Sequence, residues 1–201
     1  IPPAPRVFFG RTPLGNVWAC RADLPENLRR HLDQLLAAEP VLGTYEEPPG
    51  CRQVLYTLLA EHEPVRHEEA GPAFTFPAAI RAPAGVVPIT SANSDLLLTR
   101  FPDVLADLET SQPCIAMVED GQAVSVCFSA RITAQAAEAG VQTVPSARRR
   151  GYATAVTAGW ALAIREQGAI PLYSTAWDNH ASRSVARRLG LNLYGADWHV
   201  T

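Results

Sequence analysis

Three consecutive arginines stand before small residues in the C-terminal half of this chain, in the run Arg148-Arg149-Arg150-Gly151-Tyr152-Ala153. An extended apolar segment ends at Val144, and a long helical pattern follows the run. The first N–H groups of a helix lack intrahelical partners, and the peptide dipoles add roughly half a positive charge at that end. The run therefore predicts a site for a phosphate or pyrophosphate. A solvated basic loop that caps the helix is the alternative.

Small side chains within this run favour the first interpretation. Gly151 and Ala153 would let a ligand approach the backbone closely, and glycine also permits unusual backbone angles. The pattern does not specify which molecule carries the phosphate. A sulfate-like anion or another nucleotide is physically compatible with it.

The neighbouring segments follow a definite order around the arginine run. A strand is expected at 136–144, a second strand at 172–177, and a helix that opens at 179–182 and ends near 188–191. In this order and spacing, the chain resembles the GNAT superfamily of acyl-CoA-dependent N-acetyltransferases. The resemblance extends from near Cys114 to the C-terminus.

The resemblance implies where a co-substrate, acetyl-CoA, would bind. In this family, pantetheine lies between two splayed central strands, and its pyrophosphate meets the loop and helix N-terminus. The implied pantetheine contacts are Val141, Gln142 and Thr143, the implied pyrophosphate contacts are Arg148, Arg149, Arg150, Gly151, Tyr152, Ala153 and Thr154, and further contacts are Asn179 and Ser182. Alternatively, Asn179 is only the N-cap of the helix, and Ser182 is only a small packing residue.

The implied reaction is direct attack of a neutral amine on the thioester carbonyl, which requires a proton acceptor. Glu138, ten positions before Arg148, is the predicted catalytic base. A polar residue on a half-exposed strand, or a carboxylate that binds the acceptor, is the alternative. Many relatives carry a tyrosine that protonates the leaving thiolate, but Ala186 occupies that position here.

The proton for the leaving thiolate must therefore come from another group. Tyr173, Tyr152 or water are the candidates to replace it. Ser174 stands where relatives that modify protein N-termini have a glutamate. At pH 7, roughly a tenth of α-amines are neutral, but only about one lysine in 2,500 is, so a weak base suffices for the former. We expect a primary amine as acceptor, with a small molecule or an α-amine favoured.

Two other functions remain open at this stage. A non-catalytic acyl-CoA-binding or regulatory protein would explain Ala186 and the lack of an unambiguous base. Nucleic-acid binding would use the arginines of the run and those within the second helix, and it would depend steeply on salt. Those arginines are Arg148, Arg149, Arg150, Arg183, Arg187 and Arg188.

Composition is that of an ordinary soluble globular chain, with 201 residues, 47% hydrophobic, 18% charged and a formal net charge of −3. This charge argues against a dedicated nucleic-acid binder. No apolar run approaches the length of a membrane span, and residues 1–5 do not resemble a signal peptide, so a cytoplasmic protein is expected. The four cysteines and five histidines show no metal-ligand spacing, and buried thiols are expected. A homodimer is left open.

The N-terminal half, residues 1–85, is expected to be an α/β extension that shapes the acceptor site. It contains a strand near 17–21, a helix from Pro25 capped by Asp23, and a helix over 52–61. The Pro- and Ala-containing stretch 72–88 is the predicted linker.

Residues 86–201 form the predicted acetyl-CoA-binding domain, an α/β fold with a mixed, mostly antiparallel central sheet flanked by helices. Short helices are expected near 96–98 and 104–108. A hairpin pairs 114–118 with 123–131 across Asp120-Gly121. The helix after the arginine run buries Trp160 and ends at Gly168, the next helix ends at Gly190, and a strand over 192–200 closes the domain.

Overall fold

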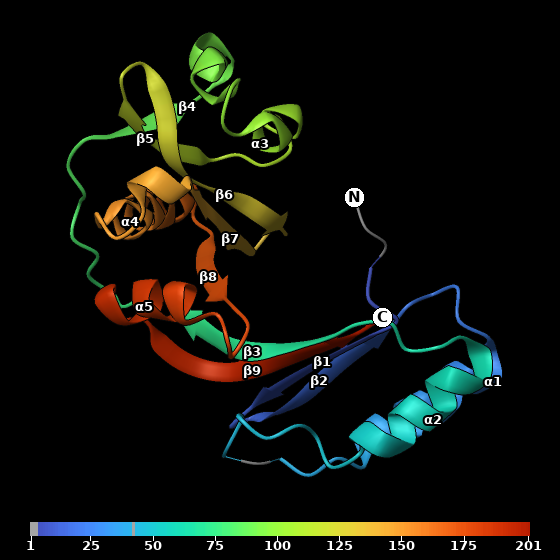
Figure 1. Cartoon of the computed structure of the whole chain (residues 1–201). Coiled ribbons are helices and arrows are strands. Elements are labelled where there is room, and N and C mark those ends of the chain that lie inside the picture. Colours follow the sequence, from blue (N-terminus) through green and yellow to red (C-terminus); the bar gives the residue numbers. More distant parts are fainter. Residues whose placement is uncertain (1–3, 42) are drawn as a thin grey trace. The chain divides into compact units, whose positions relative to one another are not determined.

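The computed structural model describes residues 4–41 and 43–201 (Figure 1). Within these residues the fold is mixed α/β, with nine strands in a mostly antiparallel sheet and helices beside it, as the sequence predicted. Ile1, Pro2 and Pro3, on which the argument against a signal peptide partly rested, lie outside the described residues.

The chain divides into two compact units. One holds the residues up to Ala73, together with Ser174–His180 and Leu193–Thr201, and the other holds Phe74–Tyr173 and Ala181–Asn192. The predicted division near residue 85, into an extension and an acetyl-CoA-binding domain, stays a prediction.

The first unit contains two helices and a group of strands in the order β2-β1-β9-β3. Their bounds are β1 Val7–Thr12, β2 Gly15–Cys20, α1 Glu26–Ala37, α2 Arg52–His62, β3 Glu68–Thr75 and β9 Asn192–Val200. The helices over 26–37 and 52–62 and the strand β2 confirm the sequence prediction. The strand β1 was not predicted from the sequence; it forms an antiparallel hairpin with β2 and pairs with β9 on its other side.

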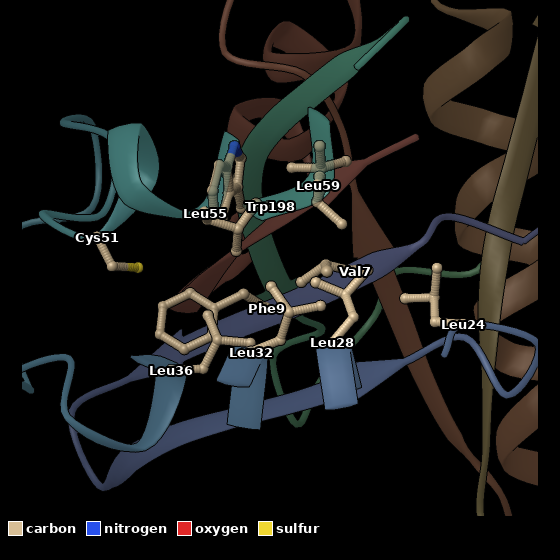
Figure 2. Close-up of a cluster of buried hydrophobic side chains, with 11 residues drawn as sticks. Val7, Phe9, Leu24, Leu28, Leu32, Leu36, Cys51, Leu55, Leu59 and Trp198 are labelled. Carbon is tan, nitrogen blue, oxygen red and sulfur yellow. The ribbon is translucent and has the colours of Figure 1, made fainter. Parts of the chain in front are cut away.

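A leucine-rich core joins these elements (Figure 2). Leu28, Leu32 and Leu36 recur every four residues, so they form one apolar stripe along α1. Figure 2 shows this stripe gathered with side chains from α2, β1 and β9. Phe9 and Trp198 are fully buried in the cluster, so apolar burial holds α1 and α2 in place.

Glu68 is the polar centre of the same unit. Its carboxylate accepts hydrogen bonds from Arg52 Nε at 2.8 Å and Nη2 at 2.6 Å, from Trp198 Nε1 at 2.6 Å, and from the Tyr56 hydroxyl. These donors come from α2 and β9, whereas Glu68 itself lies on β3. Because all of these donors stabilise the ionised form, chiefly Arg52, and together outweigh the effect of burial, the pKa of Glu68 is lowered to about 2.

One expectation about this half was wrong, and a second holds only between Thr75 and Val86, where no helix or strand forms. Asp23 does not cap α1: its carboxylate pairs with Arg21 Nε at 2.6 Å, and Pro25 is the residue before the helix. The stretch 72–88 is not simply a linker, because β3 reaches Thr75 and β4 (Val86–Ile89) begins within it. Pro72 within β3 misled the sequence analysis, since proline usually argues against a strand interior.

The second unit has strands in the order β8-β7-β6-β5-β4. Besides β4, its elements are the 3-10 helix η1 Ser91–Leu97, α3 Pro102–Ala106, β5 Cys114–Glu119, β6 Gln122–Ile132, β7 Ala136–Thr143, α4 Tyr152–Glu166, β8 Ile170–Ser174 and α5 His180–Arg188. The predicted hairpin is β5–β6. Its turn residues Asp120 and Gly121 have φ of 50° and 72°, as a two-residue turn of type I′ requires.

Side chains of this unit alternate between two apolar clusters, as expected for strands buried on both faces. Ile115 and Cys127 pack with α4 and α5, and Ala116 and Val126 pack with η1 and α3. Trp160 is fully buried on the α4 side, which confirms its predicted core role.

The ends of α4 and α5 agree closely with the sequence pattern, whereas η1 and α3 begin before the helices expected near 96–98 and 104–108. Gly168 and Gly190 have φ of 78° and 63° just beyond α4 and α5, in the left-handed region that a glycine stop uses. The strand β8 ends at Ser174, however, whereas the predicted strand ran to residue 177.

The cysteines, the potential metal ligands and the apolarity of the helices also bear on the sequence predictions. All four cysteines are free thiols, and Cys51, Cys114 and Cys127 are buried, as predicted. Over residues 4–41 and 43–201, no group of histidine, cysteine and carboxylate side chains is arranged to hold a metal ion. Within the same residues, no helix has both the length and the apolarity to span a bilayer.

Candidate functional site

The arginine run forms a short loop before α4. The strand β7 ends at Thr143, a single 3-10 turn spans Pro145–Ala147, and Gly151 is the residue before the helix. Gly151 has φ 85° and ψ −1°, which lets the chain turn sharply into α4. A Cβ added there would meet no heavy atom of the described residues within 4 Å, so the space before the helix end is open.

The N-terminus of α4 presents free donors to this open space. The first intrahelical hydrogen bond runs from the Ala155 N–H to the Gly151 carbonyl at 3.1 Å. The N–H groups of Tyr152, Ala153 and Thr154 therefore precede the hydrogen-bond ladder of the helix. Together with the helix dipole they favour an anion in front of them.

The three arginines of the loop are exposed but differ in their contacts. Arg148 Nε donates to the Thr143 carbonyl at 3.4 Å, which turns its side chain back towards β7. Arg149 has φ 64°, in the left-handed region that is unfavourable for a residue with a Cβ. Arg150 is paired with Glu119 at the end of β5.

Glu119 is the functional candidate that the sequence analysis missed. Its two carboxylate oxygens accept from Arg150 at 2.7 and 2.8 Å and from the Tyr152 hydroxyl at 2.5 Å. The Arg150 guanidinium also lies over the Tyr152 ring, 4.8 Å from its centroid. These donors lower the pKa of Glu119, first through Tyr152 and then through Arg150. No local pattern joins Glu119 to residues 150–152, so only the fold reveals the contact.

The two strands β7 and β8 separate beside this loop. Their parallel pairing begins at Ala136 opposite Ile170 and ends at Glu138 opposite Leu172. The strand β7 nevertheless continues to Thr143. Beyond Glu138, the edge of β7 that faces away from β6 is therefore not paired with β8.

Main-chain groups along this unpaired edge come from alternate residues of β7. On the opposite edge, the Val144 N–H donates to the Val124 carbonyl at 3.0 Å in the ladder with β6. Because facing residues in an antiparallel ladder alternate between bonded and non-bonded pairs, Val141 and Thr143 direct their N–H and C=O groups away from β6. The edge therefore offers donors and acceptors to an extended polar molecule.

Gln142 and Thr143 are tied to the buried Ser125 of β6. The Ser125 hydroxyl lies 3.2 Å from the Gln142 carbonyl and 2.7 Å from the Thr143 hydroxyl. The Gln142 carbonyl thus faces β6 rather than the unpaired edge, while its side chain is exposed.

Glu138, the predicted base, lies at the last paired position between β7 and β8. Its side chain is 19% exposed and its Oε2 lies 2.7 Å from Arg131 Nη1. Ala137 and Ala139 on either side pack on the α4 face, so Glu138 points to the other face of the sheet. The predicted base is thus a partly shielded carboxylate with a cationic partner.

Near the start of α5, Ser182 is bound to a buried tyrosine. The Tyr173 hydroxyl lies 2.5 Å from Ser182 Oγ, and burial raises the pKa of Tyr173 to about 12. Ala186, which stands where relatives have a tyrosine, is buried in the same cluster. Asn179 directly precedes α5 and is exposed.

Comparison with known proteins identifies this arrangement. The sequence profile of the GNAT acetyltransferase family matches residues 92–196, just over half of the chain. The chain belongs to the GNAT acetyltransferase family. Its matched region includes the whole of β5 to α5 and thus the arginine loop, the α4 N-terminus and the β7 edge. Among curated proteins, none matches the chain.

Solved GNAT structures share the fold at low identity. A GCN5-related N-acetyltransferase-like protein from Streptococcus suis has 17% identity and a TM-score of 0.57, over 98% of this chain and 85% of its own. A GNAT-family acetyltransferase from Colwellia psychrerythraea has 10% identity and a TM-score of 0.55, over 92% and 76%. A protein assigned to this family from Novosphingobium aromaticivorans has 15% identity and a TM-score of 0.52 over 68% of this chain. The chain spans 65% of the length of that last protein. At such identities the likeness shows the GNAT fold alone.

Proposed function

We propose that this chain is an N-acetyltransferase that transfers an acetyl group from acetyl-CoA to a primary amine. The proposal is supported chiefly by the presence of two features in the same unit. These are the free N–H groups at the start of α4 and the edge of β7 that is not paired with β8. The first suits a pyrophosphate, and the second suits the amide-bearing arm of pantetheine. GNAT enzymes generally use acetyl-CoA, and this co-substrate contains both a pyrophosphate and a pantetheine arm.

The chain offers specific groups to each part of acetyl-CoA. The N–H and C=O groups of Val141 and the N–H group of Thr143 would pair with pantetheine along the β7 edge, with Gln142 beside them, while the Thr143 carbonyl accepts from Arg148. The helix N–H groups of Tyr152, Ala153 and Thr154 would receive the pyrophosphate.

Further residues would complete the binding of the nucleotide end. Arg148 and Arg149 would close over the phosphates from the loop that Gly151 allows, and Arg150 would add charge from its place against Glu119. Asn179 and Ser182 would contribute from the start of α5.

For the chemical step we propose Glu138 as the proton acceptor. The attacking amine must be neutral, and the carboxylate would take its proton directly or through one water. The contact of Arg131 Nη1 with Oε2 orients the Glu138 carboxylate, and Oε1 would take the proton. An α-amine fits such a base best, because a larger share of α-amines than of lysine side chains is already neutral at pH 7. We propose a small-molecule amine or an α-amine as the acceptor.

The leaving thiolate also needs a proton. The two tyrosines considered as its donor, Tyr152 and Tyr173, both have hydroxyls that already bind other side chains. Tyr152 donates to Glu119, and Tyr173 is buried with its hydroxyl on Ser182. A pKa of about 12 makes Tyr173 a poor acid at neutral pH. We therefore assign this proton to water.

A non-catalytic acyl-CoA-binding protein is the second candidate. The buried Ala186 favours it, because no side chain at that position can supply the missing proton. It would retain the loop and the β7 edge but transfer no acetyl group. The cytoplasmic location and a homodimer stay predictions of the sequence.

The test is calorimetric titration with acetyl-CoA, followed by a panel of amines in which release of CoA thiol is measured. Gly151→Trp should abolish binding, because the indole would fill the open space before α4. Gly168→Trp is the matched control, since Gly168 has a similar φ of 78° and equally open surroundings at the other end of the same helix.

Each result has a separate meaning. Binding that survives in Gly168→Trp and is lost in Gly151→Trp supports the site. Binding without turnover of any amine would favour the non-catalytic protein. No binding of acetyl-CoA by the parent would refute both candidates. A Glu138→Gln variant that retains full turnover would remove Glu138 from the mechanism.

A further inference from the structure

The tip of the β5–β6 hairpin is attached to the arginine loop by one carboxylate. Glu119 is the last residue of β5, directly before the Asp120-Gly121 turn, and it binds Arg150 through two oxygens. It also accepts from the Tyr152 hydroxyl in the first turn of α4. One side chain thus contacts both the loop and the helix whose N-terminus would bind phosphate.

One residue of the loop, Arg149, has a backbone conformation that is unfavourable for a residue with a Cβ, so a contact from outside the loop can hold this conformation. Arg149 and Gly151, on either side of Arg150, both have positive φ, of 64° and 85°. A residue with a Cβ rarely adopts this region unless its surroundings hold it there. The Arg150 side chain lies between the two positions and is fixed at its far end by Glu119 and by the Tyr152 ring.

We propose that Glu119 is a positioning residue for acetyl-CoA, which holds Arg150 and thereby keeps the loop in the conformation that exposes the α4 N-terminus to the pyrophosphate. This inference rests on the proposed function. Glu119 itself binds no part of the co-substrate, and it acts through Arg150 and Tyr152.

The sign of its effect distinguishes this role from simple electrostatics. Glu119 carries a negative charge near a phosphate site, so its removal would strengthen phosphate binding if charge alone mattered. If Glu119 orders the loop, its removal weakens binding, because the apparent dissociation constant rises as the binding-competent fraction falls. The proposal requires the second result.

Global stability should hardly respond. The Arg150 side chain is 49% exposed, and exposed ion pairs contribute little to the free energy of folding. A Glu119→Gln variant should therefore keep the thermal midpoint of the parent while it loses affinity. This separates positioning from a merely structural role.

The experiment compares Glu119→Gln with Asp120→Asn. Asp120 is the adjacent carboxylate, so its variant removes the same charge, and asparagine tolerates the φ of 50° found there. Affinity is measured for acetyl-CoA and for S-acetylpantetheine, which lacks the pyrophosphate. We expect Glu119→Gln to weaken acetyl-CoA binding about tenfold, as a fall of the competent fraction to about a tenth implies. We expect unchanged affinity for S-acetylpantetheine, and Asp120→Asn within about twofold of the parent for both ligands.

Other outcomes overturn the inference. If the parent binds acetyl-CoA and Glu119→Gln binds it equally or more tightly, the positioning role is wrong while the proposed function stands. An equal loss of affinity for both ligands, or a large fall in the thermal midpoint, would make Glu119 merely structural. Failure of the parent to bind acetyl-CoA would refute the proposed function, and the positioning role with it.

Discussion

Gly151 allows conformation and space to be tested separately. Its φ of 85° is unfavourable for any residue with a Cβ, and left-handed backbone costs such a residue about 1–2 kcal/mol. An added Cβ meets nothing in the described structure within 4 Å, so no steric term adds to this. Alanine also reduces the conformational entropy of the unfolded chain, and this offsets roughly 0.4–1 kcal/mol of the cost of the left-handed backbone. We expect Gly151→Ala to lower the free energy of unfolding by about 1 kcal/mol.

Gly151→Asn should behave differently, because asparagine enters the left-handed region more readily than alanine. Its stability should lie within about 0.5 kcal/mol of the parent. Its side chain would still extend into the open space before the N–H groups of α4. We therefore expect the affinity for acetyl-CoA to fall at least tenfold in the asparagine variant, although its fold is intact.

Urea unfolding and calorimetric titration measure the two effects, and Gly168→Ala is the control. Gly168 has the same kind of backbone at the other end of α4, so its alanine variant should lose a similar stability, about 1 kcal/mol, with unchanged affinity. A Gly151→Ala protein as stable as the parent would show that the loop lacks the positive φ. An asparagine variant that binds acetyl-CoA normally would refute the phosphate site in front of α4.

Three further predictions concern the fold that supports the site. The folded pKa of Glu68 is about 2, below its ordinary 4.5, chiefly because of Arg52; the stability it provides is present above pH 4.5 and is lost as the pH falls towards 2. Unfolding titrations from pH 5 to 2 should thus show a steeper loss for the parent than for Glu68→Gln, and equal slopes would contradict this. Gly71→Ala would place a Cβ 1.6 Å from the Thr175 carbonyl oxygen, so we expect a loss of more than about 3 kcal/mol or no folded protein in circular dichroism, and near-parent stability would contradict that contact. Trp160→Ala should lose about 3–5 kcal/mol in urea unfolding, and a loss below about 1 kcal/mol would show that the α4 core repacks.

Most helices and the C-terminal strands could be predicted from the sequence because their signals are local. The four-residue leucine spacing of α1, the Asp120-Gly121 turn, and the stops at Gly168 and Gly190 each depend on a few consecutive residues. The missed elements lack such signals. Neither β1 nor β3 alternates clearly between polar and apolar residues, and Pro72 argued against β3.

The sequence by itself determined the family and the positively charged loop before α4, since helix ends, glycine conformations and local charge follow from neighbouring residues. Only the tertiary structure decided where the pairing of β7 and β8 ends, and which main-chain groups of β7 stay unpaired. It also decided that Glu119 holds Arg150, which is 31 residues away in the chain. Such contacts depend on strand register and on the packing of α4 against the sheet, because both bring together residues that no local pattern relates.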